Sequence, residues 1–187
     1  MPSSLIEELA SSVRGGRLLT YNSFAAPKLY PVAGDRDITS AEAQLGFTLP
    51  LLLKDIYLHV ANGGFGPGYG LLGIHGGAYE PIGDKQYTML DLYKAFRNRR
   101  KNPPWPDFLL PIAYWGCEIY SCVDCQLSEA PVFAFDPNRH GDGPWRCDCR
   151  LHANSLTEWL RRWLDGEDLW RNWPLAGPPK MGFEENT

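Results

Sequence analysis

The residues best suited to chemistry are five cysteines in the second half of the chain. Cys122 and Cys125 form a Cys-x-x-Cys pair, and Cys147 and Cys149 follow as Cys-x-Cys with His152 three residues further on. Thiolate and imidazole are the ligands that zinc prefers in tetrahedral structural sites. A spacing of two, however, is typical of one face of a strand, where a buried cysteine packs as a small hydrophobic residue. We therefore predict no metal and no cofactor, and a zinc-stabilised domain is kept as an alternative.

A glycine-rich stretch from Gly68 to Gly73 has the G-x-G-x-x-G spacing of dinucleotide-binding turns. In those proteins the motif joins a strand to a helix, so that backbone N–H groups meet a pyrophosphate. Here it follows a predicted helix and enters a predicted strand, which is the reverse order. We interpret it as a tight turn that allows close backbone approach. Phe65, just before this stretch, and Tyr69 within it are candidate exposed aromatics for a protein contact.

Other catalytic patterns are weakly supported. The four histidines are scattered, and the sequence contains no Gly-x-Ser-x-Gly nucleophile motif. Carboxylates are plentiful, but the sequence does not pair any two of them across a cleft. The Cys122-x-x-Cys125 pair follows a strand-like run, whereas a redox pair needs a helix N-terminus to lower the thiol pKa. The sequence therefore predicts that the protein is not an enzyme.

Charge and composition narrow the class of partner. The formal net charge is −4 and the pI about 5.5, which argues against a nucleic-acid partner because phosphate binding needs a concentrated positive field. Neither a basic leader nor an apolar run of about 18 residues is found, so we expect no membrane segment. The odd cysteine count favours reduced thiols and a cytoplasmic protein. The oligomeric state stays open.

Apolar residues at helical spacing predict five helices. Thr39 and Glu42 have the spacing of a capping box, and Gly46 should end that helix in the left-handed conformation. The next helix follows Leu49-Pro50 and ends before Asn62-Gly63. Residues 17–37 are predicted to be a mostly irregular connection. The predicted helices cover residues 6–13, 39–46, 49–60, 88–98 and 155–166.

Three short runs rich in aromatic and β-branched residues predict an antiparallel meander, covering residues 108–115, 117–123 and 131–135. Side chains alternate between two faces of a strand, so one face of the segment 114–124 should be buried and the other available to a partner. The pattern does not decide which face is exposed. Either an aromatic patch rimmed by carboxylates faces outward, or Trp115 and Tyr120 fill the core.

The order of these motifs resembles the SUKH superfamily, which includes fungal cell-wall-assembly regulators and bacterial toxin-immunity proteins. The resemblance begins with a short acidic helix that ends in Leu45-Gly46, followed by Leu49-Pro50, an amphipathic helix and Asn62-Gly63-Gly64. It continues through Leu110-Pro111-Ile112, which leads into Trp115-Gly116-Cys117, and through the terminal helix that begins at Ser155. Together these motifs span residues 38–170.

The resemblance implies a single α+β domain with a twisted, mainly antiparallel sheet and helices packed against it. The expected organisation is an N-terminal helix and connection over 1–37, a SUKH-like domain over 38–170 and a tail over 171–187. For bacterial members it implies a non-enzymatic immunity protein that neutralises a cognate toxin, such as a nuclease. A regulatory scaffold without a toxin partner is the alternative. The candidate partner-binding residues are Phe65, Tyr69, Trp115, Glu118, Tyr120 and Asp124.

Overall fold

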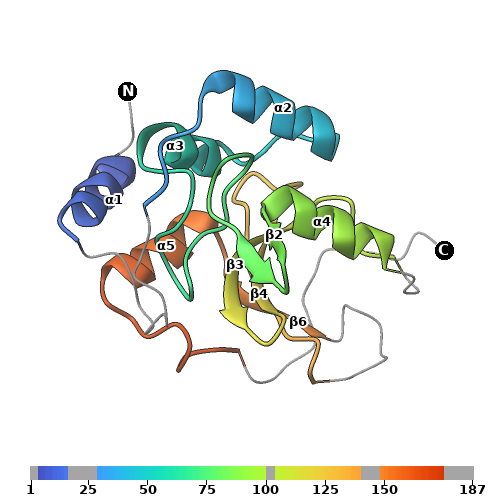
Figure 1. The fold of residues 1–187 in the computed structure, drawn as a ribbon. Coiled ribbons are helices and arrows are strands. Elements are labelled where there is room, and N and C mark those ends of the chain that lie inside the picture. Colours follow the sequence, from blue (N-terminus) through green and yellow to red (C-terminus); the bar gives the residue numbers. More distant parts are fainter. Residues whose placement is uncertain (1–3, 17–28, 100–103, 140–147, 175–187) are drawn as a thin grey trace.

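The computed structural model describes residues 4–16, 29–99, 104–139 and 148–174 (Figure 1). Within these ranges the chain forms an α+β fold with two antiparallel sheets, as predicted. The five predicted helices are all present, because their apolar stripes are the faces that the core buries. The helices are α1 (Ser4–Arg14), α2 (Asp35–Leu45), α3 (Leu51–His59), α4 (Met89–Asn98) and α5 (Leu156–Leu164).

The predicted start of α2 is wrong. The helix begins at Asp35. Its N-cap is Gly34, whose N–H donates to Asp37 Oδ2 (2.8 Å), so the helix starts about one turn before the predicted cap at Thr39. Thr39 therefore lies inside the helix, where its hydroxyl donates to the Asp35 carbonyl (2.9 Å). The predicted left-handed stop is confirmed, since Gly46 has φ +80°.

Glu42 joins α2 to α3 and does not cap a helix. Its Oε1 accepts a hydrogen bond from the Leu49 N–H (2.8 Å) and forms an ion pair with Lys54 (3.2 Å). Both partners lie beyond the end of α2, so the carboxylate holds the turn that carries Leu49-Pro50. The glutamate that local spacing assigns to a cap is thus used in a tertiary contact.

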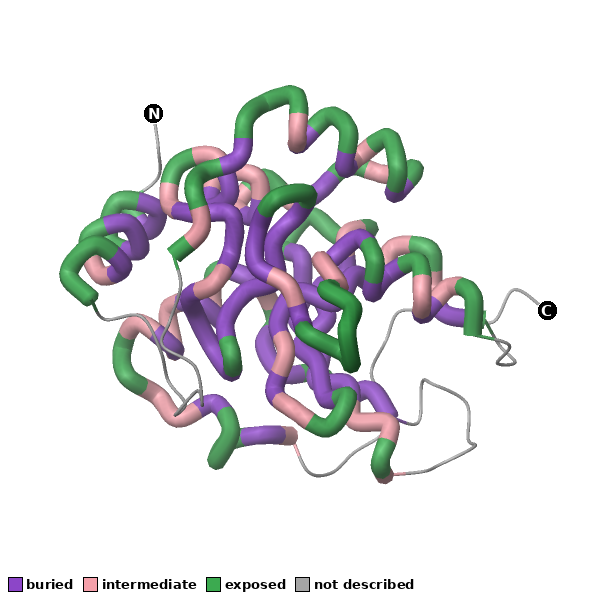
Figure 2. The backbone as a smooth tube through the Cα atoms, viewed as in Figure 1, coloured by how far each residue is buried: buried purple, intermediate pink, exposed green. Residues whose placement is uncertain are grey.

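The larger sheet has the strand order β3–β4–β5–β6, and all its pairs are antiparallel. The three strands of the predicted meander are confirmed as β3 (Leu109–Gly116), β4 (Ile119–Asp124) and β5 (Val132–Phe135). The sequence reading did not assign β6 (Cys149–Ala153) as an element. A smaller sheet is formed by β1 (Glu80–Ile82) and β2 (Lys85–Tyr87), a short hairpin that Figure 2 shows as largely exposed.

Helices cover both faces of the larger sheet. Figure 1 shows α1, α3 and α5 gathered on one side of the strands and α4 on the other. Tyr120 of β4 packs against Phe96 of α4, with ring centroids 5.2 Å apart. The next residue, Ser121, points to the opposite face and accepts a hydrogen bond from Trp115 Nε1 (2.9 Å). Every residue of β4 is therefore buried, and neither of its faces meets solvent.

The glycine-rich stretch lies along the outer edge of β3. The Tyr69 N–H donates to the Tyr114 carbonyl (2.8 Å), the Leu72 N–H donates to the Ile112 carbonyl (2.8 Å), and Leu71 forms an isolated bridge with Ala113. These bonds cover an edge that would otherwise present unpaired backbone groups. In the part of the chain that is described, no helix combines the length and apolar character needed to cross a membrane.

Asn62 anchors this stretch at its base. Its Oδ1 accepts a hydrogen bond from the Ile74 N–H (2.9 Å), and its Nδ2 donates to the His75 carbonyl (3.1 Å). The Asn62 backbone carbonyl also accepts from the Ala78 N–H (2.9 Å). The Asn62 side chain is buried, so these bonds satisfy its own amide groups where water does not reach them. The Asn-Gly-Gly motif therefore fixes both ends of a loop of about a dozen residues, in the length range of compact surface loops.

Candidate functional site

The strongest candidate site lies at the tip of the β3–β4 hairpin. Three consecutive residues have positive φ there, namely Gly116 (+93°), Cys117 (+51°) and Glu118 (+61°). A two-residue hairpin turn with positive φ usually takes Asn-Gly or a similar pair, because a side chain in this region is strained. Cys117 and Glu118 are two of the three non-glycine residues with positive φ in the described chain. Such strain is concentrated at functional sites.

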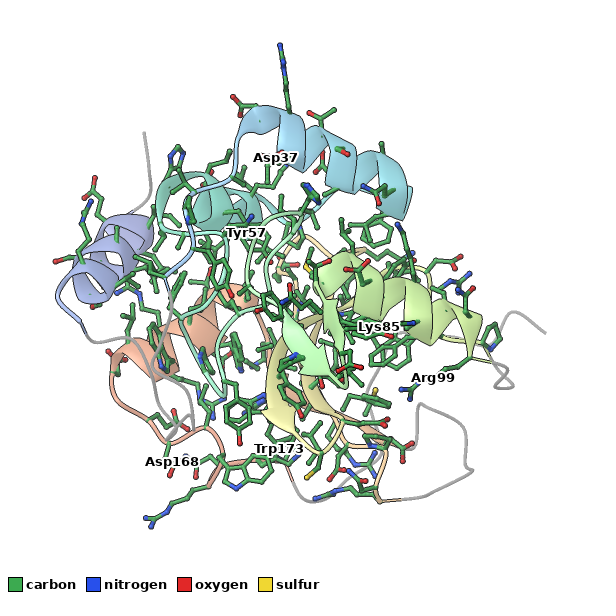
Figure 3. The ribbon with its side chains drawn as sticks, in the orientation of Figure 1. Asp37, Tyr57, Lys85, Arg99, Asp168 and Trp173 are labelled. Atoms are coloured by element: carbon green, nitrogen blue, oxygen red, sulfur yellow. The ribbon has the colours of Figure 1, made fainter. Side chains whose placement is uncertain are left out.

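Two contacts hold the tip in this conformation. Asn138 Nδ2 donates to the Cys117 carbonyl (2.8 Å), and the same amide is oriented by Asp136 Oδ1 (3.1 Å). Glu118 forms an ion pair with Arg99 (3.1 Å), which lies at the end of α4 in Figure 3. This ion pair is largely exposed, so it orients the two side chains more than it stabilises the fold.

The glycine-rich stretch places Tyr69 beside this tip. Its ring centroid lies 5.4 Å from that of Tyr114, and its side chain is 41% exposed. Gly68 makes the approach possible, because a Cβ atom there would lie 2.5 Å from the Tyr114 carbonyl oxygen. Gly116 faces the Tyr69 ring in the same way, at 3.3 Å. We call Tyr69, Tyr114, Cys117 and Glu118 the hairpin-tip surface.

A buried carboxylate lies beneath this surface. Tyr120 Oη donates to Glu80 Oε2 (2.6 Å), and both side chains are buried. Burial raises the pKa of the Glu80 carboxyl, and hydrogen bonds from Tyr120 and Tyr114 offset part of the rise. Burial and the neighbouring Glu80 also raise the pKa of Tyr120, and that of Tyr114 to about 12. The phenols therefore stay protonated donors, and the surface has the chemistry of a binding site.

Three of the six predicted contact residues come together here. Tyr69 and Glu118 are exposed at the hairpin-tip surface, and Tyr120 supports it from below. The partner-binding role of all six stays a prediction. The sequence reading missed Glu80 and Arg99, which come from β1 and from the end of α4. No local pattern signals either residue, because only the tertiary fold brings them to the hairpin.

The other three predicted contact residues lie elsewhere and are buried. Phe65 was expected to be exposed, but the glycine-rich stretch turns it inward to within 6.3 Å of the Trp163 ring in α5. Trp115 is buried on the larger sheet, where it packs against His152, Trp170 and Trp173. Asp124 lies at the other end of β4, where its Oδ1 accepts a hydrogen bond from the Gln126 N–H (2.8 Å). In this structure a partner cannot reach these three side chains.

The four cysteines that the structure describes differ in burial and do not gather as metal ligands would. Cys122 and Cys149 are fully buried, and burial raises the pKa of both thiols. Cys147 lies outside the described residues, whereas Cys117 is exposed at the hairpin tip. Within the ranges that the structure covers, no three His, Cys, Asp or Glu side chains gather as metal ligands would. His152 instead lies among tryptophan rings, 5.2 Å from that of Trp173.

A groove of about 640 Å³ contains none of the residues of the hairpin-tip surface. It is lined by the C-terminal end of α2, by α4 and by the segment before β3, together with Cys125 and Gln126. Its two basic groups are both engaged with neighbouring side chains. Lys94 Nζ donates to Gln44 Oε1 (2.7 Å), and Arg97 is paired with Asp107. The Cys125 thiol in its wall has a pKa raised by burial. The groove therefore lacks an activated nucleophile, and none of the six predicted contact residues lines it.

Fold and site together define an α+β domain whose distinctive surface is a strained hairpin tip. A model of the SMI1 / KNR4 family (SUKH-1) matches residues 33–162, which is more than half of the chain. The chain therefore belongs to the SMI1 / KNR4 family, and the predicted SUKH relationship is confirmed. At the level of the family this supports a non-catalytic, immunity-type domain. No curated protein matches the chain.

Proposed function

We propose that this protein is an immunity protein that binds a cognate toxin through the hairpin-tip surface and blocks the toxin's active or substrate-binding surface. The observation that carries the proposal is the strained pair Cys117 and Glu118, held in place by Asn138 and packed beside Tyr69. The protein has no chemistry of its own in this role. A toxin that acts inside the cell would meet it in the cytoplasm, which is where we place it.

The chemistry of the surface favours a basic partner. Tyrosine is enriched at the energetic centres of interfaces, and Tyr69 is held by its own backbone bond to Tyr114, so little conformational entropy is lost on binding. Glu118 adds an exposed carboxylate, for which a cationic partner would compete with Arg99. A cationic surface such as that of a nuclease would complement these groups and bind faster at low salt.

The test is co-expression with the toxin encoded by the neighbouring gene. We expect the wild-type chain to restore growth and to co-purify with the toxin. Tyr69→Ala should weaken the complex at least about tenfold, the effect of losing a moderate hot spot. Glu118→Lys should mainly slow association, and more so at low salt.

Matched variants separate this surface from general effects. Glu7→Lys makes the same charge change on the exposed face of α1, and Leu51→Ala removes an exposed apolar side chain at the start of α3. Both should leave rescue and affinity unchanged. Rescue by wild type that survives both Tyr69→Ala and Glu118→Lys would place the interface elsewhere, and a wild-type chain without rescue or complex would contradict the immunity role.

A further inference from the structure

A short segment after α5 folds back over the larger sheet. Residues 166–174, which we call the C-terminal strap, begin at Gly166 with φ +85°. Glu167 anchors the strap to α5 through two bonds with Arg162, at 2.7 and 2.8 Å, and accepts a third from Asn172 Nδ2 (2.6 Å). Asp168 Oδ1 accepts from the N–H groups of Trp170 and Arg171 (both 3.1 Å). The strap lies beyond the segment that the family model matches, which ends at residue 162.

The strap covers Trp115 with two indole rings. Trp170 stacks on Trp115 with ring centroids 5.8 Å apart, and Trp173 meets the same ring edge-on at 5.3 Å. Figure 3 shows Trp173 and Asp168 at the same end of the molecule. Trp115 and Trp173 are buried, while Trp170 stays partly exposed. Without the strap, an aromatic part of the sheet would face solvent.

His152 lies directly beneath this cover. Its side chain is only 7% exposed, and its ring centroid lies 5.2 Å from Trp173 and 6.5 Å from Trp115 and from Trp159. Among the described residues, neither ring nitrogen has a partner within ordinary hydrogen-bond geometry. The Leu169 backbone of the strap lies close enough to favour the protonated form, but burial and Arg162 outweigh it, so the net shift of the His152 pKa is downward. A neutral imidazole tolerates this site as a mainly apolar ring, whereas an imidazolium would be a buried charge without a bonded counter-ion.

The charged groups around His152 do not favour its protonation, because the cation Arg162 already lies beside it. Arg162 of α5 donates to the His152 carbonyl (2.7 Å), and its charge opposes protonation of the imidazole. Glu167 of the strap has the opposite effect but is occupied by Arg162, which lowers the Glu167 pKa to about 2. Strand β3 contributes Trp115 and no charged side chain. The remaining charged residues on the elements packed here are Arg150, Glu158, Arg161, Asp168 and Arg171.

We propose that His152 is an acid-sensitive latch for the C-terminal strap, and that its protonation releases the strap about Gly166 and uncovers Trp115. The released form relieves the buried charge, because it gives the imidazolium access to water. The latch involves only the strap and the sheet. The proposal can therefore be tested without any toxin partner.

The expected change in the strap-opening equilibrium with pH follows from proton linkage. Burial first, and then Arg162, lower the pKa of His152 from 6.5 to about 4. The unprotonated imidazole therefore stabilises the closed strap fully above about pH 6.5, and this contribution is lost as the pH falls through about 4. If the released form has the ordinary pKa, the opening equilibrium should rise roughly 25-fold between pH 7.5 and pH 5.

Hydrogen exchange followed by mass spectrometry tests the proposal on the full chain. After correction for intrinsic rates, protection of peptides from the strap should fall more than tenfold from pH 7.5 to pH 5. Peptides from α3, whose Leu53 and Ile56 are fully buried, should keep their protection. In His152→Phe the strap should stay protected at both pH values, since the change removes the titrating group and keeps an aromatic ring among the tryptophans. The matched variant His59→Phe, at an exposed position, should behave like wild type.

Two results would overturn the latch: strap protection in wild type that does not depend on pH, and a pH dependence that persists in His152→Phe. If that variant does not fold, the imidazole of wild type can be titrated by NMR. A His152 pKa near 4 supports the proposal, and a value near 6.5 contradicts it.

Discussion

Asn62 anchors the glycine-rich stretch, and Asn62→Ala is the sharpest test of how this stretch is held. The substitution removes the acceptor of the Ile74 N–H and the donor to the His75 carbonyl, at 2.9 and 3.1 Å. Ile74 is fully buried, so its N–H would be left without a partner, at a cost of about 1–3 kcal/mol. The His75 carbonyl is near solvent and adds less, because water can replace the lost donor. We expect a total loss of about 2–3 kcal/mol.

Thermal unfolding followed by circular dichroism measures this loss. For a chain of this length, about 2–3 kcal/mol corresponds to a fall in Tm of roughly 5–10 °C. Asn98→Ala, at an exposed position near the end of α4, is the control and should change stability by less than about 0.5 kcal/mol. An Asn62→Ala variant as stable as the control would refute the reasoning that this side chain fixes the loop.

Asn62→Asp separates the two bonds. The carboxylate keeps an acceptor for Ile74 but loses the donor to His75 and adds a buried charge. Burial raises the pKa of a carboxyl, so the aspartate should be tolerated best when protonated. The variant should therefore lose stability relative to wild type as the pH rises from 4 to 8, and a difference that is flat with pH would contradict the buried environment.

Three further results are expected. Gly68→Ala should lower Tm, because its φ of +66° alone costs a non-glycine residue about 1–2 kcal/mol and the new Cβ would lie 2.5 Å from a backbone oxygen of β3; an unchanged Tm would mean that the loop does not pack as described. Glu80→Gln should gain stability relative to wild type as the pH rises above 4.5 in urea titrations, because burial raises the pKa of Glu80 and its ionised form is the less favoured one; the opposite slope would refute this sign. In the native protein Cys117 should react readily with Ellman's reagent, whereas Cys122 and Cys149 should react only on unfolding, since burial raises their thiol pKa values; equal native rates would contradict the assigned burial.

Local patterns predicted the elements well because helices and strands bury one periodic face. The apolar residues of α4 and α5 are the ones that pack on the sheet. The start of α2 was mispredicted because two acidic residues compete for the role of cap. Asp37 and Glu42 each lie three residues after a possible N-cap, Gly34 and Thr39. Only the tertiary structure shows that Glu42 is bound to Leu49. Capping spacing alone cannot make that choice.

The candidate site was harder to predict because alternation along a strand names two faces without saying what covers each. In β4 both faces are covered, so the expectation of one exposed face fails there. Tyr69 and Glu118 are exposed for another reason, since both lie in turns. The third contributor, Glu80, is 40 residues from the tyrosine that binds it. A single sequence holds no signal for such a pair.

The bonds between the glycine-rich stretch and β3 limit how the hairpin-tip surface can vary. Lengthening or shortening that stretch would shift its backbone out of step with the strand, whereas replacing the side chain of Tyr69, Cys117 or Glu118 would leave the backbone bonds intact. New specificities should therefore arise by exchanging a few outward-facing side chains on an unchanged scaffold. Because the backbone bonds carry the fold and the outward-facing side chains carry recognition, the surface can diversify while the fold is kept.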